Sequence, residues 1–545
     1  MTQVLNANGE VVDPRTISRV RELARMNRAS ALGGGSVPYD AASITSQETG
    51  EWNAWLGSPD WETTPYRDRI VARIRDLVRN DGWASGSVTS VLDSTIGGDF
   101  RLMAKPDHRA LALFDPAFDS TWADEFARTV QSLWRGYAYD PGRWCDATRR
   151  MTVPQMFRLA FRHELVDGEA LAILPWARDR RGIGRASSAT CMQLIDPDRL
   201  SNPGLSFDTA NLRGGVEIDA YGAAVAYHIR RAHPGDWFEA NKAFVWDRVP
   251  RETSFGRPIV IHHFESDRAG QHRPAGGMFT PILARLKMLA KYDQVELQAA
   301  VINAIFAAYI ESPFDRDLVA DSLGGEMSGF QADRLDYQKE ARLSLGGAVL
   351  PVLYPGDKLQ VVNAARPSSQ YDAFQHAFLR NAAAVTGQSA EQVSKDWSKT
   401  NYSSARGALV EAWKTLGRRR QNFAIGFASP FYGAWLEEQM DRGLLPLPAG
   451  APDFIEARAA YSACRWMGPA RGWIDPVKER QGEVLAMNAG LSTLEMACAE
   501  QGLDWEEVLE QRKVELQRFE ALGLPKPEWF GAEPQYKDEV LSSQQ

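Results

Sequence analysis

The chain has 545 residues, of which 44% are hydrophobic and 24% are charged, and its formal net charge at pH 7 is -8. This length exceeds what one hydrophobic core organises, so we expect about two to four domains. No apolar run is long enough to predict a membrane span. The acidic balance argues against a protein whose main task is to grip nucleic acid tightly, because such proteins present basic surfaces.

The four cysteines lie far apart in the sequence and form no CxxC pair. This spacing argues against a ribbon-type zinc site and a disulfide scaffold, so we expect assembly in a reducing cytoplasm. Residues 1–36 contain five arginines between positions 15 and 28, followed by the run Gly33-Gly34-Gly35-Ser36. We expect a basic flexible arm and linker here. A solvated helix is the alternative for the arm.

The first half of the chain alternates amphipathic helices with short strand-like runs. Apolar residues at helical spacing predict helices over 65–79, 86–96, 118–137 and 153–166. Alternating or β-branched runs predict strands over 100–103, 170–176, 191–195, 215–218, 225–229 and 258–264. This half of the chain therefore predicts an α+β fold with a mainly antiparallel sheet.

Two long helices dominate the middle of the chain. Thr280 as N-cap and Pro281 as first helical residue predict a helix that nothing interrupts before Ile310. About thirty residues at 1.5 Å each would span roughly 45 Å. A less regular interval follows, with strand-like runs at 348–354 and 358–362. A second helix is predicted over 371–385, so the two helices flank an inserted module.

Further helices are predicted in the last third of the chain. Large apolar residues at helical spacing predict a long helix over 409–435, kinked near Pro430. Three shorter helices follow, and their start signals are Asp475-Pro476, Ser492 with Glu495, and Asp504 with Glu507.

Several short segments carry a resemblance to a known family when their order and spacing are considered together. They are Arg79–Gly86, Gln193–Leu200, Ile261–Phe264 with Arg273 and Gly276, Leu353–Asp357, Asn401–Arg406 and Gly472–Glu479. From residue 52 to residue 524 the chain resembles the lambda-type family of phage portal proteins. The resemblance implies a non-enzymatic virion protein. It would form a closed, typically dodecameric ring at one capsid vertex, through which DNA is packaged and ejected.

The resemblance also implies a portal architecture of wing, stem, clip and crown. The implied wing covers residues 37–270, together with a long helix and closing strand over 403–471. The implied stem consists of helices at 271–310 and 370–387. The clip would be inserted at 311–369, and a tunnel loop would follow at 388–402. The helical crown and C-terminal tail would cover 472–545.

Candidate contact residues follow from the same resemblance. In the tunnel loop, the candidates for contact with DNA are Lys395, Lys399, Asn401 and Tyr402. A solvated loop, anchored by Trp397, is the alternative there. In the clip, the candidates for docking are Asp315, Arg316, Asp317 and Glu326.

The partners that the resemblance implies all belong to virion assembly in the cytoplasm of a bacterial host. They are further copies of the chain, double-stranded DNA, the packaging motor (terminase large subunit), a head-completion or adaptor protein, and the major capsid and scaffold proteins. No cofactor, metal or membrane is expected. The run Arg418-Arg419-Arg420 is expected to make subunit contacts or to form a solvated helix face, with DNA contact as the alternative.

The residues alone leave two other classes of protein open. His163-Glu164 with Asp167 approaches the zinc-hydrolase pattern but lacks its second histidine. His262 and His263 also have ligand chemistry, but adjacent strand residues point to opposite faces and cannot easily share an ion. No nucleophile elbow or phosphate-binding loop is present. A zinc-dependent hydrolase is thus the weaker alternative, and another ring-forming virion protein (a head–tail adaptor or tail hub) the stronger.

Overall fold

The structure is a computed structural model that describes residues 56–310, 342–345, 348–351, 371–398, 400–470 and 476–525, with a few positions between 41 and 54. Residues 1–58 form one compact unit and residues 59–545 another, and all elements below belong to the second. The expected arm at 1–36 and most of the interval 311–369 lie outside the described residues.

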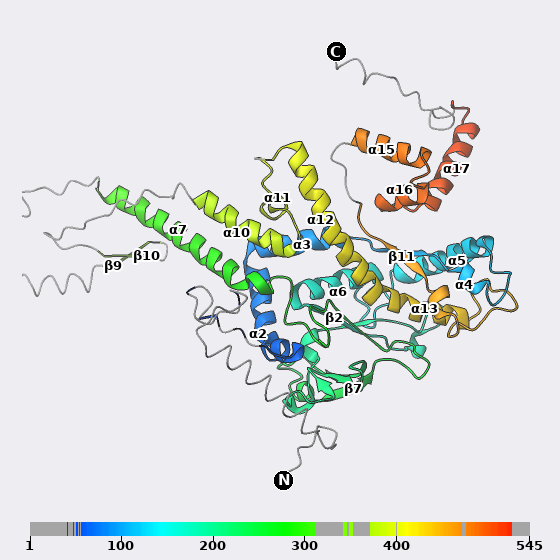
Figure 1. Ribbon diagram of the computed structural model, residues 1–545, viewed down its shortest axis with the longest axis horizontal. Helices are drawn as coiled ribbons and strands as arrows, with labels where there is room; N and C mark the ends of the chain where they lie inside the picture. The colour runs from blue at the N-terminus through cyan, green and yellow to red at the C-terminus, as the bar shows by residue number, and fades with distance from the viewer. Residues whose placement is uncertain are drawn as a thin grey trace, which may run out of the picture. The chain divides into compact units, whose positions relative to one another are not determined.

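Helices from both halves of the chain build one large hydrophobic core (Figure 1). The four helices predicted in the first half are confirmed as α2 (Pro59–Asn80), α3 (Gly82–Thr95), α5 (Ser120–Ala138) and α6 (Val153–Asp167). Asp81 and Asp119 start α3 and α5 by accepting backbone N–H bonds in their first turns. The ring of Trp134 in α5 lies 5.0 Å from that of Trp435, edge to face. Segments remote in sequence therefore share this core.

The strands pair as short antiparallel sheets, and antiparallel pairing was predicted. Strand β1 (Arg101–Ala104) pairs with β11 (Cys464–Met467) near the end of the chain. A three-stranded sheet has the order β3 (Gln193–Ile195), β2 (Glu169–Ile173), β8 (Val260–Phe264). A four-stranded sheet runs in sequence order through β4 (Leu212–Arg213), β5 (Val216–Ile218), β6 (Ala224–Arg230) and β7 (Trp246–Pro250). Strands β4 and β7 were not predicted from the sequence.

Small elements complete this part of the fold. Helices α4 (His108–Leu111) and α14 (Arg458–Tyr461) lie next to each other at the edge of the core. In the interval between the long helices, β9 (Arg342–Leu345) pairs with β10 (Ala348–Pro351) as an antiparallel hairpin. Strand β10 confirms part of the strand predicted at 348–354. The run predicted at 358–362 lies outside the described residues.

The two long helices are confirmed as α7 (Leu283–Ile310) and α10 (Tyr371–Thr386), which lie side by side (Figure 1). The hydroxyl of Tyr371 donates a hydrogen bond to Asp293 at 2.8 Å, which ties one helix to the other. The predicted cap of α7 is wrong. Thr280 lies in the 3-10 turn η6 (Thr280–Ile282) and donates its hydroxyl to the carbonyl of Gly277, so the α-helix begins only at Leu283.

The long helix predicted at 409–435 is three consecutive pieces. Helix α12 (Tyr402–Phe423) runs into the π-helical turn η8 (Ala424–Ala428), and α13 (Ser429–Asp441) follows. The predicted interruption near Pro430 is thus a π-turn that ends two residues before the proline, which has no N–H for a regular helical bond. Gly426 in this turn is required by space, because a Cβ there would lie 2.1 Å from Nδ1 of His263.

Three C-terminal helices are confirmed as α15 (Pro476–Asn488), α16 (Leu494–Glu500) and α17 (Trp505–Ala521). Asp504 caps α17 as predicted, but the predicted capping role of Ser492 is wrong. The N–H of Ser492 bonds back to the end of α15, and Thr493 caps α16 instead. None of the described helices combines the length and the apolar character that crossing a membrane requires.

Candidate functional site

The segment between α10 and α12 is only partly a loop. Ser389 and Gln392 form a reciprocal capping box that starts the short helix α11 (Ala390–Ser394). Gln388 is buried and accepts a hydrogen bond from the hydroxyl of Ser87 in α3 at 2.7 Å. Val393 packs in an apolar cluster with residues of α7 and α10. The first half of the segment is therefore held by α3 and by both long helices.

The second half of this segment exposes a positive charge. Lys395 ends α11 in the left-handed conformation, with φ of +58°, and its side chain is exposed. Its ammonium group donates to the hydroxyl of Ser90 at 3.4 Å, and this contact is exposed to solvent. Trp397 is 40% exposed, so it does not anchor the segment in the core.

The remaining residues of the segment start the next helix. Asn401 accepts a hydrogen bond from the N–H of Ser404 at 2.9 Å and thereby caps α12. Lys399 and the side chain of Tyr402 lie outside the described residues, as do the clip candidates Asp315, Arg316, Asp317 and Glu326.

Two of the three consecutive arginines in α12 point into the protein. Arg419 donates to the carbonyl of Thr386 at 3.0 Å, at the end of α10. Arg420 donates to the carbonyl of Thr95 at 2.9 Å, at the end of α3. Cations at helix C-termini satisfy carbonyls that have no partner within the helix. Arg418 instead forms an exposed ion pair with Glu265. The expectation of a solvated face therefore fits Arg418 alone.

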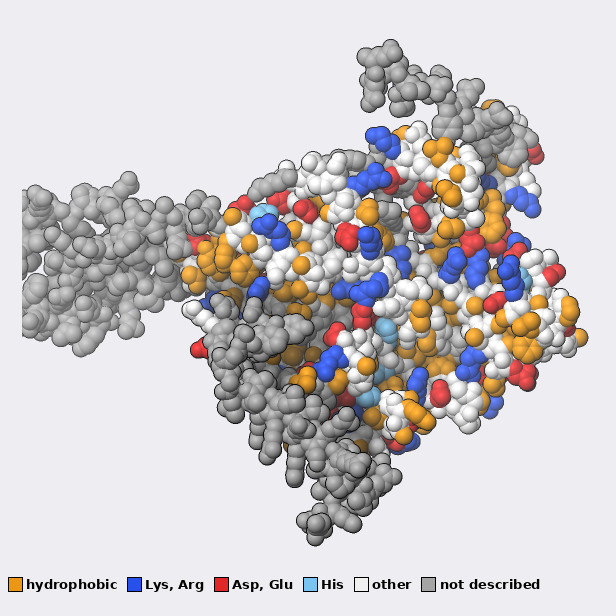
Figure 2. Space-filling model, in the orientation of Figure 1, with side chains coloured by type: hydrophobic (Ala, Val, Ile, Leu, Met, Phe, Trp, Pro, Cys, Tyr) orange, Lys and Arg blue, Asp and Glu red, His pale blue; other side chains and the backbone are white. Residues whose placement is uncertain are grey.

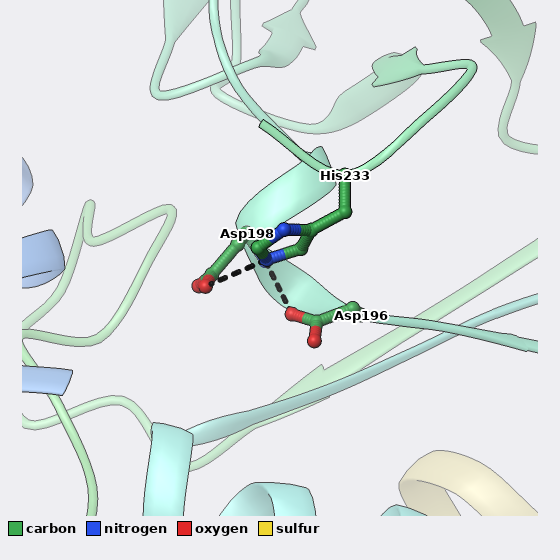
Figure 3. A group of neighbouring side chains, drawn as sticks. All are labelled: Asp196, Asp198 and His233. Atoms are coloured by element: carbon green, nitrogen blue, oxygen red, sulfur yellow. Dashed lines mark hydrogen bonds and ion pairs between the residues drawn. The ribbon is translucent and has the colours of Figure 1, made fainter. Parts of the chain in front are cut away.

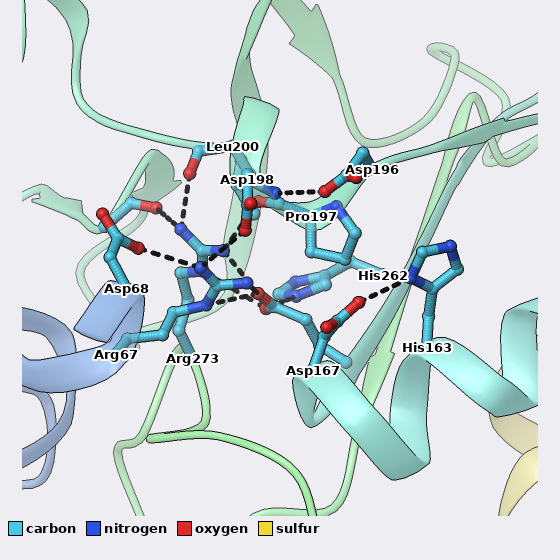
Figure 4. A network of polar contacts seen from close by, with 12 residues as sticks. Arg67, Asp68, His163, Asp167, Asp196, Pro197, Asp198, Leu200, His262 and Arg273 are labelled. Atoms are coloured by element: carbon cyan, nitrogen blue, oxygen red, sulfur yellow. Dashed lines mark hydrogen bonds and ion pairs between the residues drawn. The ribbon is translucent and has the colours of Figure 1, made fainter. Parts of the chain in front are cut away.

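A buried charge network lies where α2, α6, β2 and the approach to α7 meet (Figure 4). Glu169 is fully buried at the start of β2. Its carboxylate accepts from Nε of Arg67 at 2.8 Å, from Nε2 of His262 at 2.8 Å, and from the guanidinium of Arg273. Arg273 also donates to backbone carbonyls, including that of Pro197 at 3.0 Å. The network ties the residues before α7 to the sheet.

Two of the segments that carry the family resemblance meet in this network: Gln193–Leu200 contributes Asp196 and Asp198, and Ile261–Phe264 with Arg273 contributes His262 and Arg273. Arg67 and Glu169 hold them together, and sequence reasoning missed both. Arg67 could have been noticed, because it precedes Ile70 and Ile74 on the apolar face of α2.

The charges set the protonation states inside the network. Burial raises the pKa of the Glu169 carboxyl, but Arg273 and Arg67 outweigh burial and hold the pKa well below its ordinary value. Burial lowers the pKa of His262, although its bond to Glu169 opposes this. Burial also raises the pKa of Asp167, and its bonds to His163 and Arg75 more than compensate, so the pKa is lowered. Asp167 and Glu169 are therefore ionised at neutral pH.

Glycines allow the approach to α7 to pack directly on the end of α6. A Cβ on Gly277 would lie 2.3 Å from the carbonyl oxygens of Leu165 and Val166. A Cβ on Gly276 would lie 2.6 Å from a methyl group of Ile70. Side chains at either position would displace the backbone that leads into α7. Packing and ion pairing thus fix the same end of this helix.

The histidines considered as zinc ligands are bound to acidic residues instead. Nδ1 of His163 lies 2.6 Å from Asp167, whose other carboxylate oxygen accepts from Nε of Arg75 at 2.7 Å. His262 faces Glu169, whereas His263 lies 3.5 Å from Glu164. The pairs therefore match a structural role rather than that of a hydrolase.

Among the described residues, Asp196, Asp198 and His233 alone place three ligand-type atoms within 4.8 Å of one another (Figure 3). Nδ1 of His233 accepts from the N–H of Gly235 at 3.0 Å, so the proton of the neutral ring lies on Nε2, which faces Asp198. Arg75 already neutralises both carboxylates, at 3.1 Å and 2.7 Å. A protonated nitrogen beside paired carboxylates does not fit a metal site.

Comparison with known proteins agrees with the resemblance seen in the sequence. The family model for the lambda family of phage portal proteins matches residues 45–420. The portal protein of Escherichia phage N15 is 35% identical over 491 residues, which cover 88% of this chain and 90% of that protein. Portal protein B of Escherichia phage lambda is 34% identical over 491 residues, with 88% and 89% covered.

Similar solved structures come from gene transfer agent particles. A chain in the neck of an empty particle is 13% identical, with a TM-score of 0.38, over 88% of this chain and 98% of that chain. A chain in the virion of the native particle is also 13% identical, with a TM-score of 0.35, over 84% and 94%.

The family match defines a structural component of the virion rather than an enzyme. The chain belongs to the lambda family of phage portal proteins, and its function is that of the DNA channel at a capsid vertex. Membership of this family implies an oligomeric ring in the neck of the virion.

Proposed function

We propose that the subunits close into a ring, dodecameric as is typical of the family, through the helix α7. The supporting observation is that α7 carries apolar residues on all its faces and leaves several of them exposed. Met288 is 65% exposed, Leu297 67%, Val295 48% and Val301 44%. A helix that is apolar all round requires cover from several sides, and α10 covers only one. In a cyclic ring each subunit offers a different face to each neighbour, which would supply that cover.

The division of the chain follows from this arrangement. We assign 37–270 and 403–471 to the wing, 271–310 and 370–387 to the stem, 311–369 to the clip, 388–402 to the tunnel loop and 472–545 to the crown and C-terminal tail. One hydrophobic cluster joins residues between 74 and 261 to residues between 416 and 461, which supports a wing built from two remote segments. The paired helices α7 and α10 support a stem that carries the interval 311–369 as an insertion.

The tunnel loop is the proposed point of contact with DNA. Lys395 supports this, because it is exposed on a segment whose other half is held by α3, α7 and α10. An ammonium group at such a position makes brief phosphate contacts while the acidic chain as a whole does not retain the duplex. Lys399, Asn401 and Tyr402 are proposed to line the same point, with Asn401 also capping α12.

The clip is the proposed docking surface for the packaging motor, the terminase large subunit. Asp315, Arg316, Asp317 and Glu326 supply alternating charges in this part of the sequence. We propose that a head-completion or adaptor protein replaces the motor on the same surface after packaging. The scaffold and major capsid proteins are proposed to meet the ring during assembly of the head in the bacterial cytoplasm.

Electron microscopy of the purified chain, with its mass from light scattering, tests ring formation. Rings with a central channel are expected. Leu297→Glu should prevent them, since it places a charge within the proposed subunit contact. Glu411→Gln, at an exposed residue of α12, is the control and should leave rings intact. Rings of unchanged size from Leu297→Glu would contradict the role of α7.

DNA packaging into capsids tests the tunnel loop. Lys395→Glu should reduce the amount of packaged DNA and leave rings intact, because the side chain is exposed and belongs to no hydrophobic cluster. Lys414→Glu is the matched control, as Lys414 is exposed on α12 outside the segment. Normal packaging by Lys395→Glu would contradict the assignment. A point substitution is preferable to deleting the loop, since deletion would remove the buried Val393.

A further inference from the structure

Ion pairs attach the C-terminal helices to the rest of the protein. In these pairs the negative charges lie on the helices and the positive charges lie on the surface beneath them. In these pairs between described residues, the carboxylates come from α16 and α17: Glu495, Glu506 and Glu507. All the cations come from β1, α5, β11 and the residue after β1. The pairs are Lys105–Glu495 at 3.0 Å, Arg465–Glu495 at 3.7 Å, Arg128–Glu506 at 3.6 Å, Arg101–Glu507 at 3.5 Å, and Arg135–Glu507. Figure 2 shows red and blue side chains meeting along this boundary.

Apolar packing adds little to this attachment. Helices α15 and α17 have no buried residue, and α16 has only Cys498. The three hydrophobic clusters of the described residues contain no residue from 476–525. Cavities of about 370 Å³ and 200 Å³ remain at the boundary, lined by Glu507 and Arg135 in one case and Glu506 and Lys105 in the other. The contact is therefore polar and incompletely packed.

The surface beneath the C-terminal helices is basic. Arg128 and Arg135 lie two turns apart on one face of α5, roughly 10 Å along the helix axis. Arg101 and Arg465 project from the paired strands β1 and β11, and Lys105 follows β1. These five residues form what we call the basic face. They outnumber the two carboxylates that line the same cavities from this side, Asp99 and Asp124.

We propose that the basic face is a binding surface for duplex DNA and that Glu495, Glu506 and Glu507 occupy it when DNA is absent. The proposal rests on the portal function, because a portal subunit meets duplex DNA directly. Carboxylates and phosphates bind the same guanidinium groups, so the two ligands exclude each other. A duplex offers about six phosphate charges over 10 Å, against three carboxylates on the helices. DNA at high local concentration therefore displaces α16 and α17.

The strength of the attachment suits a displacement of this kind. The paired arginines and Lys105 are between 40% and 69% exposed, so solvent and salt screen each pair. The interval 468–470 before α15 remains held, because Arg420 donates to the carbonyl of Pro469. The C-terminal helices can thus leave the basic face without releasing the wing core.

Binding of a fluorescent duplex of about 30 base pairs to the full-length chain tests the proposal at about 50 mM and 200 mM salt. The triple variant E495Q/E506Q/E507Q should bind at least about tenfold more tightly than the unmodified chain, because several competing pairs are removed together. Adding R128Q and R135Q should abolish this gain. The gain should also diminish steeply between the two salt concentrations, since each phosphate neutralised releases counterions.

The control variant E217Q/E239Q/D247N makes the same change in net charge. It removes three carboxylates that pair with Arg248, Lys242 and Arg231 at the surface, away from the basic face. Equal gains in the two triple variants would overturn the proposal, as would a gain that persists with R128Q and R135Q. Binding of an acidic polypeptide by this chain, without binding of the duplex, would also refute the proposal.

Hydrogen exchange of the unmodified chain tests displacement independently of any variant. Amides of α16 and α17 should exchange faster when the duplex is added, while those of α5 should not. DNA binding without faster exchange in α16 and α17 would refute displacement. Ring formation in electron microscopy reports on the portal assembly separately, so failure of this proposal and failure of the proposed function are distinguishable.

Discussion

Replacing Glu169 by Gln tests how the buried charge network holds the root of α7. The change keeps the size of the side chain and removes its negative charge. Glu169 is fully buried and compensates Arg67 and Arg273, which are themselves 2% and 3% exposed. Without the carboxylate, two guanidinium groups remain in the interior with fewer negative partners.

The expected cost follows from the contacts that remain. Removing one partner of a buried ion pair costs about 3–5 kcal/mol. Arg67 would keep Asp198 at 3.4 Å, and Arg273 would keep the carbonyls of Pro197 and Gly214 at 3.0 Å. We therefore expect the lower end of that range, about 3 kcal/mol.

Local hydrogen exchange is the appropriate assay, because a chain of this size need not unfold in one step. Amides of β2 and β8 in Glu169→Gln should exchange about a hundredfold faster than in the unmodified protein. Glu217→Gln is the control, since Glu217 pairs with Arg248 at 2.8 Å near the surface. This substitution should change the exchange rates of β2 and β8 little. If Glu169→Gln changed exchange no more than Glu217→Gln does, the network would not be what holds this region.

Three further predictions concern single positions. Asn401→Ala should destabilise the start of α12 by about 1 kcal/mol and Asn401→Asp should not, which hydrogen exchange of 402–406 will measure. Burial lowers the pKa of His262, so the imidazole of this residue binds a proton more readily in the unfolded chain than in the folded protein. The free energy of unfolding should therefore decrease as the pH falls below about 6.5, and urea titrations of His262→Gln should show a weaker decrease. Gly277→Ala should lower the melting temperature, since the added Cβ would lie 2.3 Å from two carbonyl oxygens of α6. Gly407→Ala, in α12 with open space around it, should not.

The local periodicity of the sequence determined most of the helices. The apolar positions of α2 recur every three or four residues, and Ile70, Ile74, Leu77 and Val78 pack on the core side as predicted. The order of short motifs determined the family, and the family match confirms it. Local signals were less reliable at helix starts. Thr280 and Ser492 have side chains suited to helix caps, but each is hydrogen-bonded elsewhere. The hydroxyl of Thr280 donates to the carbonyl of Gly277, and the N–H of Ser492 donates to the carbonyl of Ala486.

Only the tertiary structure decided which charges meet. Arg67 and Glu169 are 102 positions apart, and Arg101 and Glu507 are separated by most of the chain. No periodicity predicts such pairs, because they depend on how whole elements pack. Burial then gave the same residue types opposite roles. Glu169 lies in the core and binds Arg67 and Arg273 in front of α7, whereas Glu507 makes half-exposed ion pairs that salt or DNA is expected to replace.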